Sequence, residues 1–304
     1  LRFALGVHDY SIMKLQPHFP GYPTFLFFAK VVFFFANSLG ITFSIMGGIS
    51  IFVIIHFTCK LARIELNTPA GLFCSATIFF NPLLWIISNR YMPDIFGAAI
   101  MVAALYYLIS HNDLDYKLII GAFLTGILAG TRLSYLPFLI VPVALAIYKS
   151  ENKNYFFYSF LIGILVWLLP FVWVTGWNDL ITAASKQTIG HFTDFGGTSI
   201  TENNWNLRLE LFFSSIWADG FGGFLAGRHW LTIILSIMFS FLLLLSAKSF
   251  INNFKINDVA KLLFYSLLVY SIWILFFQNV IYKSRHVIPI IIVLLYFLAV
   301  GKGT

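Results

Sequence analysis

The sequence predicts an all-α protein, a polytopic bundle of transmembrane helices with an interfacial helix and one long outer loop. Of its 304 residues, 60% are hydrophobic and 10% are charged, whereas soluble domains have about 45–50% apolar and about 25% charged residues. The 35 Phe, 14 Tyr and 8 Trp residues suit a lipid-facing surface with aromatic belts. A soluble fold could not bury this much apolar surface, so we expect residues 1–304 to form a single membrane domain.

Nine apolar segments are expected to cross the membrane, whose hydrocarbon core is about 30 Å thick. Cut at charged residues and at Asn, Gly and Pro, they are 41–58, 68–88, 93–110, 117–131, 134–148, 156–175, 230–247, 262–280 and 286–300. A single span over 117–148 is the alternative for the fourth and fifth, and it would place Arg132 at mid-membrane. Gly130 and Pro137 flank this polar break and favour two short helices.

Residues 1–40 are expected to hold an outer loop and the interfacial helix. Tyr22–Asn37 is apolar, but Lys30 interrupts it and prolines precede it, so we expect it to lie along the membrane surface. The chain begins at Leu1 with a polar segment, which we interpret as a fragment that lacks a first membrane helix.

The short, lysine-rich loops are expected to share the cytoplasmic side of a prokaryotic inner membrane. They are the segments around Lys60 and Arg63, His111–Lys117, Lys149–Lys153, Lys248–Lys261 and Lys302. The opposite side collects the N-terminal segment, the Arg90–Asp94 turn, the Arg132 turn, the long 176–229 loop and the Lys283–His286 turn. Ionisable residues therefore gather at helix ends, which is typical of a reaction site at one membrane surface and unlike an ion-coupled carrier.

Other features of the sequence narrow the function classes. Cys59 and Cys74 lie in or beside apolar runs and indicate buried small side chains, with no disulfide framework or cysteine-based metal site. The formal net charge of +7 suits contact with anionic lipids or phosphorylated lipids. Basic residues are scattered singly between apolar runs, so no nucleic-acid partner is expected.

Four short motifs carry a family resemblance. They are His8-Asp9-Tyr10 followed by Gln16-Pro17-His18-Phe19-Pro20-Gly21-Tyr22-Pro23, then Arg90–Asp94, Gly126–Arg132 and Lys283-Ser284-Arg285-His286. In combination they resemble the GT-C superfamily of membrane glycosyltransferases, in particular the protein O-mannosyltransferase and aminoarabinose-transferase-like group. In that group an acidic residue after the first membrane helix precedes a His-Pro-Pro element. Asp9, His18 and Pro20 match this pattern, and Phe19 replaces the middle proline.

The resemblance implies transfer of a sugar from a polyprenyl-phosphate donor to an acceptor hydroxyl of a lipid, glycan or protein at the outer face. A carboxylate at the membrane surface can take the proton of the acceptor hydroxyl, and Asp9 is the best candidate. The resemblance makes Asp94 a second catalytic acid, which orients the acceptor or helps to hold a divalent metal such as Mg or Mn. Asp94 also follows Pro93 at a helix start, where an acid can simply stabilise the helix dipole. No His or Cys cluster with ligand spacing supports a metal site.

Fixed cations are needed to meet the charge that develops on the leaving lipid phosphate. The expected substrate-binding residues are His8, His18, Arg132, Arg228, Lys283, Arg285 and His286. Lys283 and Arg285 are the leading pair, although each basic residue could instead anchor the chain to lipid headgroups.

The long outer loop, 176–229, is too polar to cross the membrane and too aromatic for a simple linker. We expect Leu207–Ile216 to form a short interfacial helix and the loop to close over the site as a lid; a mobile surface loop is the alternative. A transporter or flippase of lipid-linked or small polar substrates, or a noncatalytic scaffold, are the alternative functions. One outward cavity that unites the polar residues favours the enzyme, and a path that reaches both sides favours the transporter.

Overall fold

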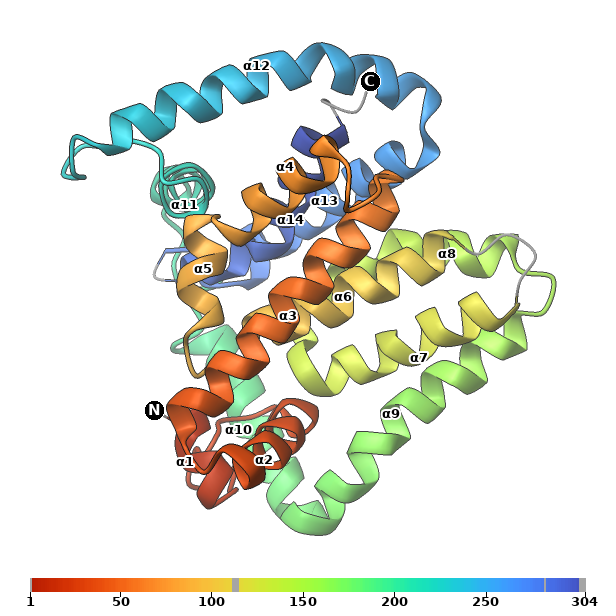
Figure 1. Ribbon diagram of the computed structural model, residues 1–304. Helices are drawn as coiled ribbons and strands as arrows, with labels where there is room; N and C mark the ends of the chain where they lie inside the picture. Colours follow the sequence, from red (N-terminus) through yellow and green to blue (C-terminus); the bar gives the residue numbers. More distant parts are fainter. Residues whose placement is uncertain (1, 111–114, 282, 301–304) are drawn as a thin grey trace.

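The computed structural model of the protein is a bundle of helices (Figure 1). The structure describes residues 2–110, 115–281 and 283–300. Within these ranges the regular elements are all helical, apart from an isolated antiparallel bridge between Ser11 and Gln16. The all-α prediction is therefore confirmed. Residues 111–114 of the expected His111–Lys117 loop, and Lys302, lie outside the described residues.

Fourteen α-helices and three shorter helical turns are described. The α-helices are α1 (Arg2–His8), α2 (Pro23–Ala36), α3 (Leu39–Ala62), α4 (Pro69–Phe79), α5 (Pro82–Ser88), α6 (Asp94–Ile109), α7 (Asp115–Arg132), α8 (Ile140–Lys149), α9 (Lys153–Thr175), α10 (Trp177–Thr193), α11 (Trp205–Ser214), α12 (Thr232–Ile256), α13 (Asp258–Phe277) and α14 (Ile288–Val300). The turns are η1 (Leu133–Leu139), η2 (Ser215–Gly220) and η3 (Ser284–Val287).

Helices α6 and α7 run antiparallel and pack closely through glycines. A Cβ atom added at Gly97 in α6 would lie 2.6 Å from the Cβ of Arg132, at the end of α7. One added at Gly121 in α7 would lie 2.9 Å from Leu108, near the end of α6. The N-terminal end of α6 therefore lies beside the C-terminal end of α7.

Helices α7 and α9 run parallel. The Ser159 hydroxyl donates to the carbonyl of Ile119 at 2.6 Å, and Trp167 Nε1 donates to the carbonyl of Gly126 at 2.9 Å. Positions further along α9 thus meet positions further along α7, so the chain must turn back between them. It does so at η1, which contains Pro137, and α8 returns (Figure 1). This reversal favours two short helices over a single span across 117–148.

By length and composition, four apolar stretches could each cross a membrane. They are Leu39–Ala62, Tyr116–Lys149, Lys153–Thr175 and Asp258–Phe277, with the bent pair α4 and α5 as a fifth. The stretch Tyr116–Lys149 contains α7, η1 and α8. The apolar side chains that α9 leaves exposed, such as Leu169 at 62% and Trp173 at 90%, suit contact with lipid. These helices are those of an integral membrane protein, whereas the nine crossings and the position of α2 at an interface remain predictions.

The expected single span over 68–88 is broken into α4 and α5, which are bent by 61°. Pro82 lacks a backbone N–H and disfavours helical geometry at Asn81, whose ψ is 126°. The side chain of Asn81 accepts from the amide of Leu84 at 3.1 Å and donates to the carbonyl of Gly220 at 2.7 Å. The break therefore fixes α5 to η2, in the long segment that precedes α12.

The segment 176–229, expected to be mostly loop, contains α10, α11 and η2. Helix α11 overlaps the expected Leu207–Ile216 helix, whereas α10 was not predicted. Further along, the apolar segment 230–247 is part of a longer helix, α12, which continues to Ile256. We refer to residues 176–229 below as the insert.

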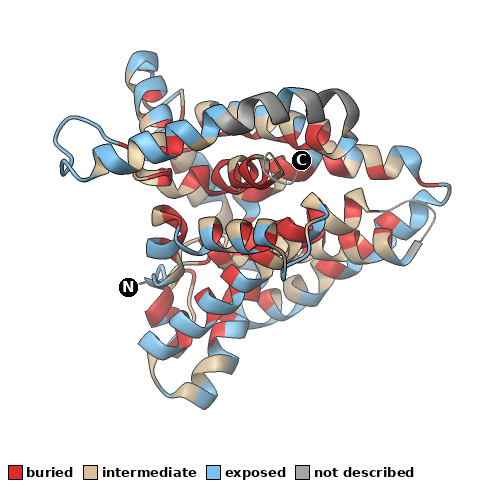
Figure 2. Ribbon diagram, turned by 45° about the horizontal axis from the view of Figure 1, so that its top comes forward, coloured by how far each residue is buried: buried red, intermediate tan, exposed pale blue. Residues whose placement is uncertain are grey.

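The core of the bundle surrounds α14, where ten of thirteen residues are buried (Figure 2). Helices α3, α4 and α6 contribute to the same apolar cluster. Cys59 and Cys74 are both buried in it as free thiols, in agreement with their expected packing role. This rigid centre holds the helix ends that form the candidate site.

Candidate functional site

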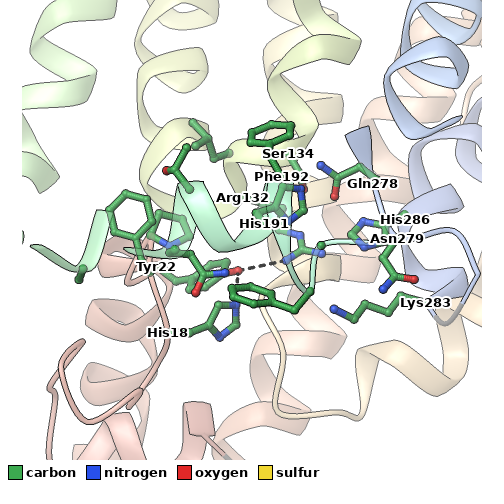
Figure 3. Close-up of a pocket in the computed structure, with 18 of the residues that line it drawn as sticks. His18, Tyr22, Arg132, Ser134, His191, Phe192, Gln278, Asn279, Lys283 and His286 are labelled. Atoms are coloured by element: carbon green, nitrogen blue, oxygen red, sulfur yellow. Dashed lines mark hydrogen bonds between the residues drawn. The ribbon is translucent and has the colours of Figure 1, made fainter. Parts of the chain in front are cut away.

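A cavity of about 990 Å³ lies where several helix ends meet (Figure 3). Its wall comes from four parts of the chain: residues 2–22, 132–140, 182–196 and 273–286. Asp94 at the start of α6 contacts both Arg132 at the end of α7 and Arg285 before α14. These contacts show that the ends of α6, α7 and α14 share one end of the bundle.

The lining of this cavity is strongly cationic. Its basic side chains are Arg2, Arg132, Lys186, Lys283 and Arg285, and its histidines are His18, His191 and His286. Among the described residues that line it, none is Asp or Glu. A concave wall with charge of one sign focuses the electrostatic potential and attracts an anion.

Asp94 lies directly behind the cavity and orients its arginines. The carboxylate is 1% exposed, with Oδ1 2.7 Å from Nη2 of Arg132 and 3.7 Å from Nε of Arg285. Among the described atoms neither carboxylate oxygen has a hydrogen-bond donor, so both contacts are ion pairs. Gly97 permits the approach of Arg132, because a larger residue there would collide with its side chain. Asp94 thus holds the guanidinium groups by charge.

His18 and Tyr22 extend this cluster from the N-terminal segment. The Tyr22 hydroxyl lies 3.1 Å from Nε2 of His18 and accepts from Nη1 of Arg132 at 3.5 Å (Figure 3). Burial, followed by the positive charge of Arg132, lowers the pKa of His18 to about 4. Burial and the neighbouring Arg285 likewise lower the pKa of Lys283. The cluster therefore resists further protonation.

The wall of the cavity is apolar away from the cations. Apolar lining residues that are also exposed at the surface are Met13, Leu15, Leu133, Ile140 and Phe195, with exposed fractions from 42% to 58%. Besides Arg132 and Arg285, the lining residues Ser134, Trp273 and His286 carry buried polar atoms with no hydrogen-bond partner among the described atoms. The cavity thus offers charge, unused polar groups and an apolar mouth to a ligand.

The structure brings together most of the expected site residues. His18, Arg132, Lys283, Arg285 and His286 all line the cavity, and Asp94 supports them from behind.

Three expected residues, His8, Asp9 and Arg228, are not among those that line the cavity. The Asp9 side chain is 61% exposed and pairs with Lys14 at 2.9 Å. Arg228 pairs with Asp219, and the His8 ring packs against Phe33.

Sequence reasoning did not single out several residues of the cavity as ligand contacts. These are Arg2, Lys186, His191, Gln278 and Asn279. Lys186 and His191 lie on α10, whose polar composition hid it from a search for apolar runs. No motif in the sequence indicates that α10 faces the Arg132 turn.

No family model, curated protein or solved structure matches the chain. The resemblance to GT-C glycosyltransferases therefore rests on the short sequence motifs alone. Within the described residues there is no group of three or more His, Cys, Asp or Glu side chains that could hold a metal ion. The Asp94 carboxylate faces two guanidinium groups, which does not fit the role of metal ligand, one of the two roles that the resemblance implies for it.

Proposed function

We propose that the protein transfers a sugar from a polyprenyl-phosphate donor to an acceptor hydroxyl, with the donor phosphate bound in the cationic cavity. The observation that carries this proposal is the convergence of five basic side chains from four parts of the chain, without a carboxylate among the described lining residues. Such a set can hold a phosphate by charge-assisted hydrogen bonds and can stabilise the charge that develops on a phosphate leaving group.

The carrier lipid is accommodated by the apolar mouth of the cavity. Exposed apolar side chains of Met13, Leu15, Leu133 and Ile140 border the lining. A hydrocarbon chain in contact with them would leave water while its phosphate stays near Arg132. This arrangement favours a lipid-linked anion over a free, fully polar one.

In the proposed reaction the acceptor hydroxyl attacks the anomeric carbon, and the bond from that carbon to the phosphate oxygen breaks. Electrons go to the phosphate, where Lys283 and Arg285 stabilise the added charge. The hydroxyl proton goes to a base, for which we retain Asp9. Because Asp9 pairs with Lys14 outside the lining, it reaches the acceptor only if this exposed pair opens.

The position of the cavity supports an enzyme over a transporter. Its polar lining comes from helix ends that meet at one end of the bundle, rather than from a path between both ends. We assign this end to the outer face of a prokaryotic cytoplasmic membrane, which labelling of cysteines introduced at exposed positions from outside intact cells would test.

The deciding experiment uses the full-length protein, purified in detergent, with radiolabelled polyprenyl-phosphate sugars and a mixed pool of lipid, glycan and peptide acceptors. The proposal predicts label transfer that falls at low donor concentration when Lys283 and Arg285 are both replaced by Ala, because binding of the donor phosphate is weakened. Movement of the donor across proteoliposomes without any label transfer would instead indicate a flippase.

A further inference from the structure

The C-terminal end of α13 is held by a fully buried arginine of the insert. Arg208 on α11 is 0% exposed. Its Nε and Nη2 donate to the carbonyl of Leu275 at 3.0 and 2.6 Å, and Nη2 donates to the carbonyl of Gln278 at 3.1 Å. A helix leaves its last four carbonyls without helical donors, and a cation there is stabilised by the helix dipole.

The carbonyls of the two residues between Leu275 and Gln278 are also bound by the insert. The amide of Ser199 donates to the carbonyl of Phe276 at 2.9 Å. His191 Nε2 lies 2.9 Å from the carbonyl oxygen of Phe277, to which it donates when that nitrogen carries the proton. Each carbonyl from 275 to 278 therefore has a donor from the insert, so this helix end is a docking site for it.

Arg208 also folds the insert onto itself. Its Nη1 donates to the carbonyls of Gly197 and Glu202, at 2.8 and 3.3 Å, and its guanidinium lies 6.0 Å from the ring centre of Trp205. All five of its hydrogen bonds go to backbone carbonyls. A buried cation is costly unless its donors are satisfied, and the docked arrangement satisfies them with backbone carbonyls.

The docked insert completes the cavity from two sides. Helix α10 brings Lys186 and His191 to the lining, and the end of α13 leads directly into Gln278 and Asn279, which also line it. Arg208 itself is not among the lining residues. We infer that Arg208 is a positioning residue, which holds the insert against α13 and so sets the geometry of the anion site. The statement that this geometry binds an anion rests on the proposed function.

The role requires the shape of arginine as well as its charge. The planar guanidinium reaches carbonyls in three directions, whereas a lysine ammonium is a compact point charge that cannot span them. Arg208→Lys keeps the charge and most of the volume, so it tests the fork geometry. Glu210→Gln is the matched control, because Glu210 is exposed on the same helix.

Two measurements on the full chain in detergent test the inference. Hydrogen exchange reports the opening of the docked insert through the amide of Ser199, and calorimetric titration with farnesyl phosphate reports the anion site. In Arg208→Lys we expect exchange at Ser199 to become at least about tenfold faster, because the opened state gains population. We expect the Kd for farnesyl phosphate to rise by at least about tenfold, with both values unchanged in Glu210→Gln.

Unchanged exchange and affinity in Arg208→Lys would overturn the inference. Faster exchange at Ser199 with an unchanged Kd for farnesyl phosphate would also overturn it, because docking would then not set the geometry of the anion site. If the variant does not fold, the wild-type protein decides: exchange at Ser199 as fast as in an unstructured peptide would refute docking. A wild-type protein with a protected Ser199 amide and no affinity for farnesyl phosphate would support the docking but contradict the proposed function.

Discussion

Replacing Asp94 by Asn is the most direct test of how the cavity is built. The amide keeps the size of the side chain but removes the charge that faces Arg132 at 2.7 Å and Arg285 at 3.7 Å. Asp94 is 1% exposed and the Arg132 side chain 6% exposed, so little water is available to solvate the guanidinium left behind. We expect the variant to lose both stability and affinity for the lipid phosphate.

The magnitude follows from burial. Removing one partner of a buried ion pair costs about 3–5 kcal/mol, and loss of an acid in the first turn of a helix adds about 0.3–1 kcal/mol. The control is Asp219→Asn, which removes the partner of Arg228 where the two side chains are 31% and 46% exposed. An exposed pair contributes only about 0.2–1 kcal/mol, so the two substitutions should differ by at least about 2 kcal/mol.

The assay is reversible unfolding in mixed micelles with increasing dodecyl sulfate, read by tryptophan fluorescence. A loss in Asp94→Asn no larger than that in Asp219→Asn would refute the argument that this ion pair organises the site. Replacing Asp94 by Leu together with Arg132 by Met should cost less than Asp94→Asn alone, because one of the two stranded guanidiniums is removed with the acid.

Four further predictions address the chemistry and the packing. Asp9→Asn should lower sugar transfer by about 10²–10⁴-fold without loss of membrane insertion, and a variant that keeps more than half of its turnover would assign the base elsewhere. Lys283→Ala with Arg285→Ala should raise KM for the donor more than for the acceptor; Lys261→Ala, which removes a surface pair with Asp258, is the control. The pKa of His18 is lower in the folded than in the unfolded state, so the folded state binds fewer protons between about pH 6.5 and 4. As the pH is lowered through this range, the free energy of unfolding should decrease by up to about 3 kcal/mol. His18→Gln should flatten that part of the unfolding-free-energy profile, and an unchanged slope would contradict the assignment. Gly163→Ala should destabilise by about 1–3 kcal/mol, since its Cβ would lie 2.4 Å from the carbonyl oxygen of Phe123, whereas Gly48→Ala meets open space and should not lower the midpoint of thermal unfolding.

Long apolar segments could be located from the sequence because their length alone requires a helix in lipid. The expected spans 41–58, 156–175 and 262–280 correspond to α3, α9 and α13. The break at Asn81–Pro82 was visible as a proline but was read through, because apolarity continues on both sides. Helix α10 was missed because it is polar and contains no long apolar run, which was the signal used to locate helices.

The site could be predicted where motifs mark it and not where tertiary packing makes it. His18, Arg132 and the Lys283–His286 turn were found through family resemblance, and the structure gathers them in one cavity. The role of Asp94 depends on Gly97 and on the antiparallel course of α6 and α7, which no local pattern encodes. Arg208 lies in the expected Leu207–Ile216 helix, but its role could not be predicted, because two of its partners are backbone carbonyls 67 and 70 residues further along the chain.

The electrostatics of the cavity give a reason to expect an anionic ligand that is independent of any resemblance. Burial is the main reason why the pKa values of His18 and Lys283 are lowered, and the positive charge of neighbouring cations lowers both further. Among the described residues, Asp94 is the carboxylate that contacts them; it lies behind the wall and neutralises part of the charge of the arginines. Clustered cations repel one another unless an anion lies among them. A phosphate in this cavity would reduce that repulsion and meet the buried polar atoms of Ser134, Trp273 and His286, which supports the anionic ligand that we propose.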